Sequence, residues 1–198
     1  MLNFLSVIPK LNQIFQKPKL QHVARFEGIL GTALELQLLV DNQAVANEAQ
    51  TRVLNEITRL ERVYSRFQPD SELNLWQAAG SAIPSSDLAW LLLEAERWHQ
   101  ISQGAFHPVI QSVQEAYKNG IPSPEQLEQL RLALETPLWN WDKDQVHKLT
   151  KLNLNFNSLA KGRIADMACL AALQLGGVHE VLVNLAGDCR DVTRRTQP

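Results

Sequence analysis

The residue types best suited to chemistry lie in two segments near the end of the chain. Residues 155–162 (NFNSLAKG) predict a tight polar entry into a helix, and residues 180–188 (EVLVNLAGD) predict a buried strand that ends in a small-residue turn with a carboxylate. A strand, a turn and a helix N-terminus commonly hold a phosphate-bearing ligand, because backbone N–H groups and the helix dipole point toward it. Lys161 adds a cation. The pattern favours an anion site, but such turns also serve only to connect elements.

The elements that must position these segments follow from the hydrophobic pattern. Residues 25–40 alternate polar and apolar side chains and predict one strand, in which Gly28 and Gly31 indicate a bulge or a close backbone approach. Short strands are predicted on either side of a turn at residues 142–144. Apolar residues at helical spacing predict helices over residues 47–65, 85–102, 108–118, from 124 onward, and 163–175. The order predicts an α/β or α+β fold.

Composition limits the function classes. The 198 residues carry 45% hydrophobic side chains and a net charge of −2, without the basic stripe that a nucleic-acid partner requires. Two cysteines form no disulfide framework, and no run approaches a membrane span. The N-terminus lacks the features of a signal peptide, so a cytoplasmic location is expected. We expect a leader at residues 1–20, a folded domain at 21–190, and a polar tail without strand or helix at 191–198.

Five motifs, taken in order, resemble one known family. They are FEGILGT (26–32), YSRFQPDSEL (64–73), GAFHP (104–108), NFNSLAKGRIAD (155–166) and VNLAGD (183–188). Their sequence and order are similar to those of the FAD:protein FMN transferases, the ApbE family. The resemblance implies a single α/β domain with a mixed sheet and flanking helices, in which the C-terminal part of the family's domain is missing.

The resemblance also implies an activity. Such enzymes bind FAD and Mg²⁺ and transfer the FMN moiety to a Thr or Ser hydroxyl of a target protein, with release of AMP. The partners would be FAD and the protein to be flavinylated, and family members are often periplasmic or membrane-anchored. Two other interpretations stay open because the metal-ligand segment is absent: a non-catalytic FAD-binding or interaction protein, and a degenerate fragment that does not fold alone.

The family motifs place site residues on this sequence, although none is assigned a catalytic role. Expected FAD contacts are Leu30, Phe67, Ala105, Phe106, His107, Asn155, Lys161, Gly187 and Asp188, and the expected metal contact is Ser158. Without the family, Leu30 and Phe67 fit a core or packing role as well as a ligand contact, and the spacing of Phe106 favours a core aromatic. Likewise, Asn155 and Ser158 are good helix caps.

Three positions depart from the family pattern. His107 stands where the family has Asp, so a group that only accepts hydrogen bonds is replaced by a neutral ring with one donor and one acceptor. Asn155 also replaces Asp but keeps an acceptor. Ala186 replaces a Gly and narrows the room for a close backbone approach.

Overall fold

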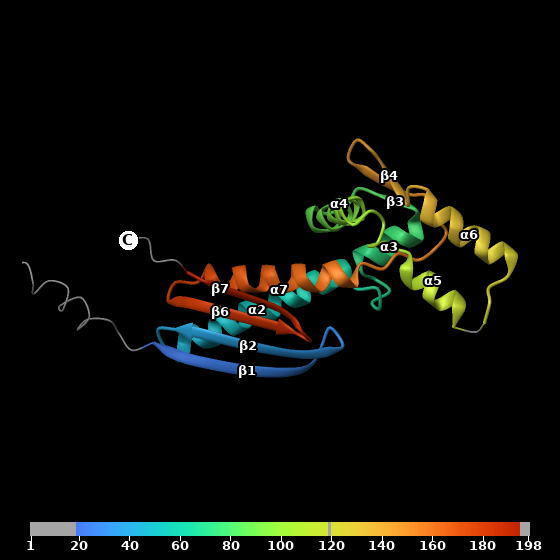
Figure 1. Cartoon of the computed structure of the whole chain (residues 1–198). Coiled ribbons are helices and arrows are strands. Elements are labelled where there is room, and N and C mark those ends of the chain that lie inside the picture. Colours follow the sequence, from blue (N-terminus) through green and yellow to red (C-terminus); the bar gives the residue numbers. More distant parts are fainter. Residues whose placement is uncertain (1–18, 119, 195–198) are drawn as a thin grey trace, which may run out of the picture. The chain divides into compact units, whose positions relative to one another are not determined.

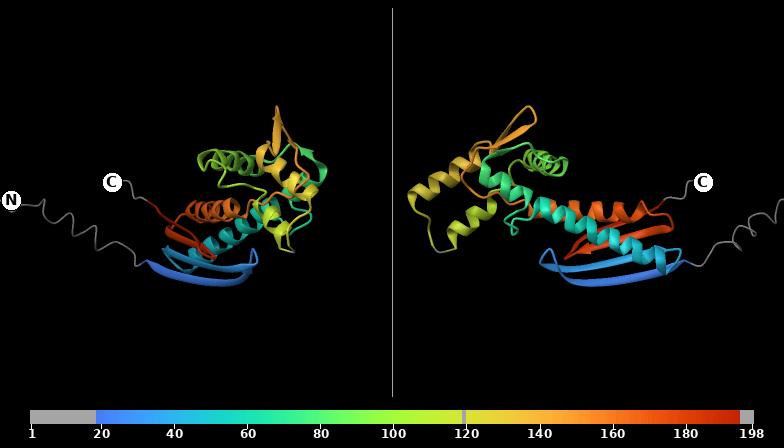
Figure 2. Two further views of the ribbon diagram at one scale, coloured as in Figure 1. Left: turned by 45° about the vertical axis from the view of Figure 1, so that its right-hand side comes forward. Right: turned by 180° about the vertical axis from the view of Figure 1, so that it is seen from behind.

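The computed structural model describes residues 19–118 and 120–194 and divides into two compact units (Figures 1 and 2). The first unit contains residues 1–55 and 165–198, and the second contains residues 56–164. Most of the expected leader at residues 1–20 lies outside the described residues, but Leu20 already begins a strand. None of the helices in the described part of the chain is long and apolar enough to cross a membrane.

The first unit is built on a four-stranded antiparallel sheet in the order β1-β2-β6-β7. Its strands are β1 (Leu20–Ile29), β2 (Thr32–Val40), β6 (Val178–Leu185) and β7 (Asp188–Thr193). Alternate side chains of β2 and β6 are buried, among them Leu36 and Val183. Residues 43–55 of α2 (Gln43–Tyr64) and 165–173 of α7 (Asn157–Leu173) lie along one face of the sheet (Figure 1). The sheet therefore has one covered face, as its alternating pattern requires.

Two strand predictions in this unit are wrong. Residues 25–40 form two strands, because Leu30 and Gly31 adopt positive φ angles of 52° and 71° and reverse the chain between Ile29 and Thr32. The bulge indicated by Gly28 is present, since the β1–β2 register shifts between Phe26 and Ile29. Residues 191–193, expected to lack a strand, belong to β7, so β6 is paired on both edges.

The second unit combines helices with a small antiparallel sheet in the order β3-β5-β4. Besides residues 56–64 of α2 and 157–164 of α7, its elements are α3 (Glu72–Ala79), β3 (Ser81–Ala82), α4 (Ser86–Ile101), α5 (Ile110–Tyr117), α6 (Pro124–Glu135), β4 (Trp139–Asp142) and β5 (Gln145–Lys148). Three aromatic rings form its centre: Trp139 meets Trp76 and Phe156 edge-on, with ring centroids 6.4 and 5.9 Å apart. The indole Nε1 of Trp76 donates to the carbonyl of Val146 at 3.2 Å.

The α/β class is confirmed. In place of the mixed sheet that the family resemblance implied, there are two sheets in which every strand pair is antiparallel. Helix starts were predicted best where a cap exists. Ser123 and Gln126 form the expected capping box of α6. Several boundaries differ. Helix α2 begins at Gln43 rather than at residue 47, α7 begins at Asn157 rather than Arg163, and residues 149–156 leave β5 as a loop instead of extending it. Helix α3, which Ser71 caps, was not predicted.

Candidate functional site

Five of the ten predicted site residues gather around one cavity in the second unit. The cavity has a volume of about 520 Å³, within the range of small-molecule sites. The predicted residues that line it are Ala105, Phe106, His107, Asn155 and Ser158. The sequence did not point to the other walls, which come from Arg66, from α5 with Ile110, Gln111, Gln114, Glu115 and Lys118, and from Asn157. Three segments far apart in the sequence therefore meet here.

The loop of residues 149–156 is fixed to the rest of the unit by backbone hydrogen bonds. Gln77 holds Leu154 twice: its Nε2 donates to the Leu154 carbonyl at 3.4 Å, and its Oε1 accepts from the Leu154 N–H at 2.7 Å. The next N–H, of Asn155, donates to the Pro108 carbonyl at 2.9 Å. These bonds explain why the expected strand ends early, because the backbone groups of this loop are used by partners outside the sheet. They also set the position of Asn155.

Asn155 starts a chain of hydrogen bonds along the cavity wall. Its Oδ1 accepts from the N–H of Asn157, the first residue of α7, at 2.9 Å, and its Nδ2 donates to Oε1 of Gln111. Gln111 in turn donates from Nε2 to Oε1 of Glu115 at 2.6 Å. The capping interpretation of Asn155 is thus confirmed, and the same side chain also lines the cavity. The family has a carboxylate at this position, which carries no N–H. The amide of Asn155 supplies the N–H that donates to Gln111.

His107 lies in the wall with its ring nitrogens engaged by the protein. The side chain is 6% exposed, and its Nδ1 accepts from the Val109 N–H at 3.4 Å. Burial and the neighbouring His99, whose ring stands edge-on at 4.9 Å, lower the pKa of His107, while a hydrogen bond with the backbone of Leu134 acts in the opposite direction. The ring is therefore neutral near pH 7. Its hydrogen bonds to backbone groups hold the 104–108 segment in place.

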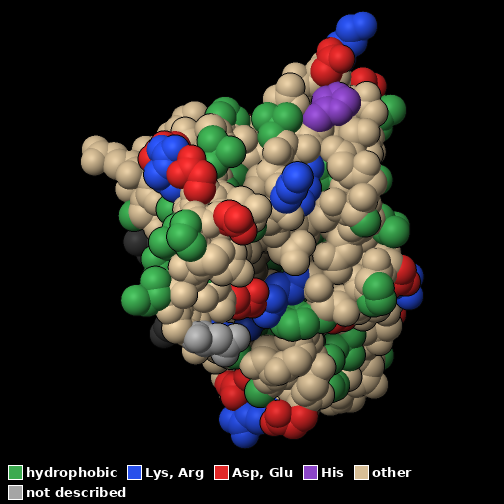
Figure 3. Space-filling view, turned by 90° about the vertical axis from the view of Figure 1, so that its right-hand side faces the viewer, with side chains coloured by type: hydrophobic (Ala, Val, Ile, Leu, Met, Phe, Trp, Pro, Cys, Tyr) green, Lys and Arg blue, Asp and Glu red, His purple; other side chains and the backbone are tan. Residues whose placement is uncertain are grey.

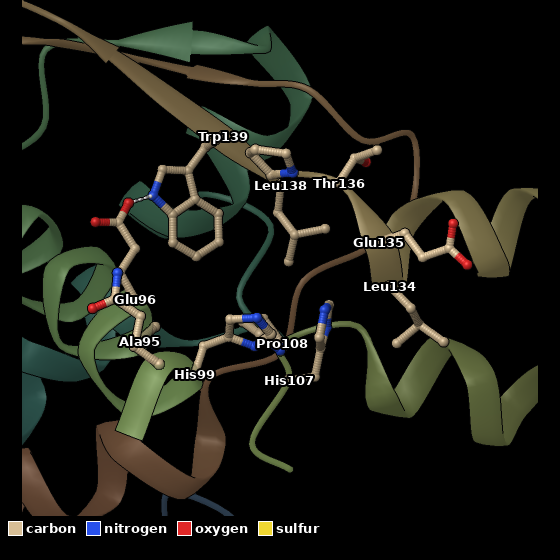
Figure 4. Close-up of a pocket in the computed structure, with 12 residues that line it drawn as sticks. Ala95, Glu96, His99, His107, Pro108, Leu134, Glu135, Thr136, Leu138 and Trp139 are labelled. Atoms are coloured by element: carbon tan, nitrogen blue, oxygen red, sulfur yellow. Dashed lines mark hydrogen bonds between the residues drawn. The ribbon is translucent and has the colours of Figure 1, made fainter. Parts of the chain in front are cut away.

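His107 also lines a second cavity, of about 370 Å³ (Figure 4). Its wall is mostly apolar and includes Leu134, Leu138 and Trp139. The carboxylate of Glu96 accepts from Nε1 of Trp139, shown as a dashed line in Figure 4, and from Nε1 of Trp141 at 3.3 Å. Apart from His107, none of the predicted site residues lines this cavity.

Arg66 is one of the residues lining the first cavity that sequence reasoning missed. Its Nε is fully buried and has no hydrogen-bond partner within the described part of the chain. Its guanidinium carbon lies 4.3 Å from the ring centroid of Phe67, the predicted aromatic contact. Phe67 itself is 72% exposed and is not among the residues that line the cavity. The signal available in the sequence was a basic residue directly before the predicted aromatic.

The other predicted residues lie elsewhere in the chain. Lys161 occupies the second turn of α7 and is not among the residues that line this cavity. Leu30 lies in the β1–β2 turn of the first unit. Gly187 and Asp188 lie at the β6–β7 turn of that unit, where the N–H of Gly187 donates to Oδ1 of Asn184 at 2.9 Å. Their contacts with a ligand stay predictions.

The expected metal does not fit the residues that this structure describes. No group of three or more His, Cys, Asp or Glu side chains suitable for a metal ion occurs within residues 19–118 and 120–194. Mg²⁺ requires near-octahedral oxygen ligation, and Ser158 with its neighbours does not provide it. On the face shown in Figure 3, acidic and basic side chains are interspersed. We therefore assign no chemical step to a metal bound by these residues.

Comparisons with known proteins define first a class and then a family. The fold is similar to that of solved flavin transferases. For a flavinyl transferase ApbE from Pseudomonas stutzeri in its apo form, the identity is 21%, the TM-score is 0.73, and the match covers 90% of this chain and 60% of that one. For the flavin transferase ApbE from Vibrio cholerae, the identity is 17%, the TM-score is 0.70, and the match covers 86% and 58%.

A third structure, the ApbE protein from Thermotoga maritima, matches with 20% identity and a TM-score of 0.69, over 87% of this chain and 59% of that one. This chain thus spans about three fifths of the length of these structures. A model of the ApbE family matches residues 30–197, and the chain belongs to that family. A search of curated proteins gave no match.

Proposed function

We propose that this chain binds FAD at the cavity lined by Arg66, Phe106 and Asn155 and acts in protein flavinylation. One observation carries the proposal: three family motifs from separate parts of the sequence contribute to a single cavity of about 520 Å³. The cavity offers a cation, amide groups and an aromatic side chain, which are suited to a phosphate-bearing aromatic ligand. Membership of the ApbE family supports the same substrate.

The proposed reaction transfers the FMN moiety of FAD. The hydroxyl oxygen of a Thr or Ser on the target protein attacks the phosphorus of the FMN half, and the bond from that phosphorus to the AMP oxygen breaks. AMP leaves, the hydroxyl proton passes to a base or to solvent, and a phosphoester joins FMN to the target. The residues of this chain would bind and orient FAD.

The first test is a titration of the purified chain with FAD, with and without Mg²⁺, followed by flavin fluorescence. We expect saturable binding, and the two conditions show whether Mg²⁺ has any effect on it. A Phe106→Ala variant should weaken binding, because it removes an aromatic side chain from the cavity wall. As a matched control, Trp98→Ala removes a 40% exposed aromatic side chain that is not among the residues lining the cavity.

The outcomes separate the proposed activities. Binding followed by covalent flavin on a Thr- or Ser-containing target, with AMP in the supernatant, supports the transferase. Saturable binding without transfer, and without a response to Mg²⁺, would instead identify a flavin-nucleotide-binding protein without catalysis. A folded chain that does not bind FAD would contradict both.

A further inference from the structure

We infer that Arg66 recognises the phosphate groups of the flavin nucleotide, and that the site therefore selects phosphorylated flavins over riboflavin. The inference deepens the proposed function and rests on it. It concerns a residue that the family motifs did not single out as a contact. The argument depends on an unused donor, a fixed position and the arrangement of neighbouring charges.

The first step is the unused donor. A guanidinium carries five N–H donors in a planar fork that matches phosphate oxygens. In Arg66 the Nε is buried without a partner, and the side chain makes no ion pair with any described Asp or Glu. A buried donor without a partner destabilises the protein, because it has lost its hydrogen bonds to water. An anionic ligand in the cavity would remove that cost.

The second step is the fixed position of the loop that carries Arg66. Ser65 Oγ accepts from the N–H groups of Phe67 and Gln68, both at 3.2 Å, and its carbonyl accepts from Ser71 Oγ at 2.5 Å. Nδ2 of Asn74 donates to the carbonyls of Ser65 and Gln68 at 3.2 and 2.8 Å. The loop is thus held on both sides of Arg66. Stacking on Phe67 orients the guanidinium plane as well.

The third step is the arrangement of charges in the cavity wall. Glu115 also lines the cavity, but its Oε1 accepts from Gln111. Lys118 adds a second cation to the same wall, whereas Lys161 is not among the lining residues. The cations available to a phosphate in this cavity are therefore Arg66 and Lys118. Arg66 is the partly buried one of the two, so water screens its charge less.

Arg163 shows why an unused donor alone is not sufficient. Its Nε is also buried without a partner among the described residues, and its guanidinium carbon lies 4.3 Å from the ring centroid of Trp90. Arg163 is not among the residues that line the cavity. The combination of an unused donor with a place in the cavity wall therefore distinguishes Arg66.

The test compares ligands that differ in phosphate content. Binding of FAD, FMN and riboflavin is measured for the wild type and for Arg66→Gln, Arg66→Lys and Arg97→Gln. The last variant removes an exposed arginine that also stacks on the following aromatic residue and lies outside the cavity lining. Circular dichroism and thermal melting establish that each variant is folded, and Arg66→Lys supplies a second variant that keeps the charge.

We expect Arg66→Gln to weaken FAD binding about tenfold or more, the scale of one charge-assisted hydrogen bond. Arg66→Lys should lie between the wild type and Arg66→Gln, and Arg97→Gln should match the wild type. Riboflavin should bind the wild type more weakly than FAD does, and Arg66→Gln should leave riboflavin binding unchanged. FAD affinity that stays within twofold in a folded Arg66→Gln protein, or an equal loss for riboflavin and FAD, would overturn the inference. Wild-type protein that does not bind FAD would instead contradict the proposed function.

Discussion

Hydrogen bonds to backbone and to side-chain groups restrain the polar side chains around the cavity, and His107 is held by the backbone. Its imidazole accepts from the Val109 N–H and is 6% exposed. A carboxylate at this position, as in the family pattern, would be buried against His99 and apolar side chains. His107 therefore has a structural role in the 104–108 segment that spacing alone did not reveal.

The lowered pKa of His107 gives a stability prediction. The folded protein resists protonation of this ring, whereas the unfolded chain binds the proton near the ordinary pKa of 6.5. The stability that the neutral, buried ring contributes is therefore fully present above about pH 6.5. It is lost as the pH falls through that value toward the lower pKa of the folded protein. We expect His107→Gln to lose less stability than the wild type between pH 7.5 and pH 5, measured by urea unfolding with tryptophan fluorescence.

His147→Gln provides the control for this experiment, because it removes a histidine from β5 in the same unit. Measured in the same way, it shows whether a changed dependence on pH is specific to the position of His107. If His107→Gln and the wild type lose stability in parallel, the ring is not the group that titrates.

Asn155 stabilises the start of α7, since its Oδ1 accepts a hydrogen bond from the first N–H of this helix. We expect Asn155→Ala to reduce the free energy of unfolding by about 1 kcal/mol, the usual cost of losing a helix cap. Asn155→Asp should lose less, because a carboxylate can still accept from the Asn157 N–H and is favoured by the helix dipole. Chemical denaturation of the three proteins tests this order. Equal stability of the Ala and Asp variants would show that the bond to Gln111, rather than the cap, matters.

The β1–β2 turn gives a second prediction for an element. Leu30 adopts a left-handed conformation with φ 52°, which disfavours a branched side chain. Asn-Gly is the favoured pair for such hairpin turns. Leu30→Asn should therefore stabilise the protein by about 0.5–1 kcal/mol. If Leu30 is also the FAD contact that the family implies, the same change should weaken FAD binding.

Lys143 serves as the matched control for Leu30, because it has a φ of 57° in the β4–β5 turn and no predicted ligand role. Lys143→Asn should raise the melting temperature without changing FAD affinity. Stabilisation by Leu30→Asn with unchanged FAD affinity would mean that Leu30 is only a turn residue.

The elements that sequence predicted well are those whose signals are local. The capping box of α6 and the period of α4 need only neighbouring residues. The β1–β2 turn was missed because a left-handed Leu is not a turn signal. The end of β5 was missed because Gln77, more than seventy positions away, captures the backbone of Leu154. Arg66 was missed for a similar reason, since an unused donor is visible only once every partner is placed.

Each of the two compact units of the molecule contains side chains that can report on its own unfolding. All five tryptophans lie between residues 76 and 141, within the second unit. Cys169 lies in the first unit, where burial raises the pKa of its thiol to about 12. Because the thiolate is the reactive form, Cys169 should resist thiol reagents at pH 8 in the folded protein. Exposed Cys189 should react, and Cys189→Ser would leave Cys169 as the single thiol.

This pair of probes tests whether the units unfold together. Helices α2 and α7 each contribute residues to both units, and helix formation is cooperative along a continuous segment. Loss of one unit would expose the apolar face of half of each helix. We therefore expect that, in the Cys189→Ser protein, Cys169 labelling and tryptophan fluorescence share one urea midpoint. Labelling of Cys169 at a lower urea concentration than the fluorescence change would show that the first unit opens on its own, and coupling through the shared helices would then be refuted.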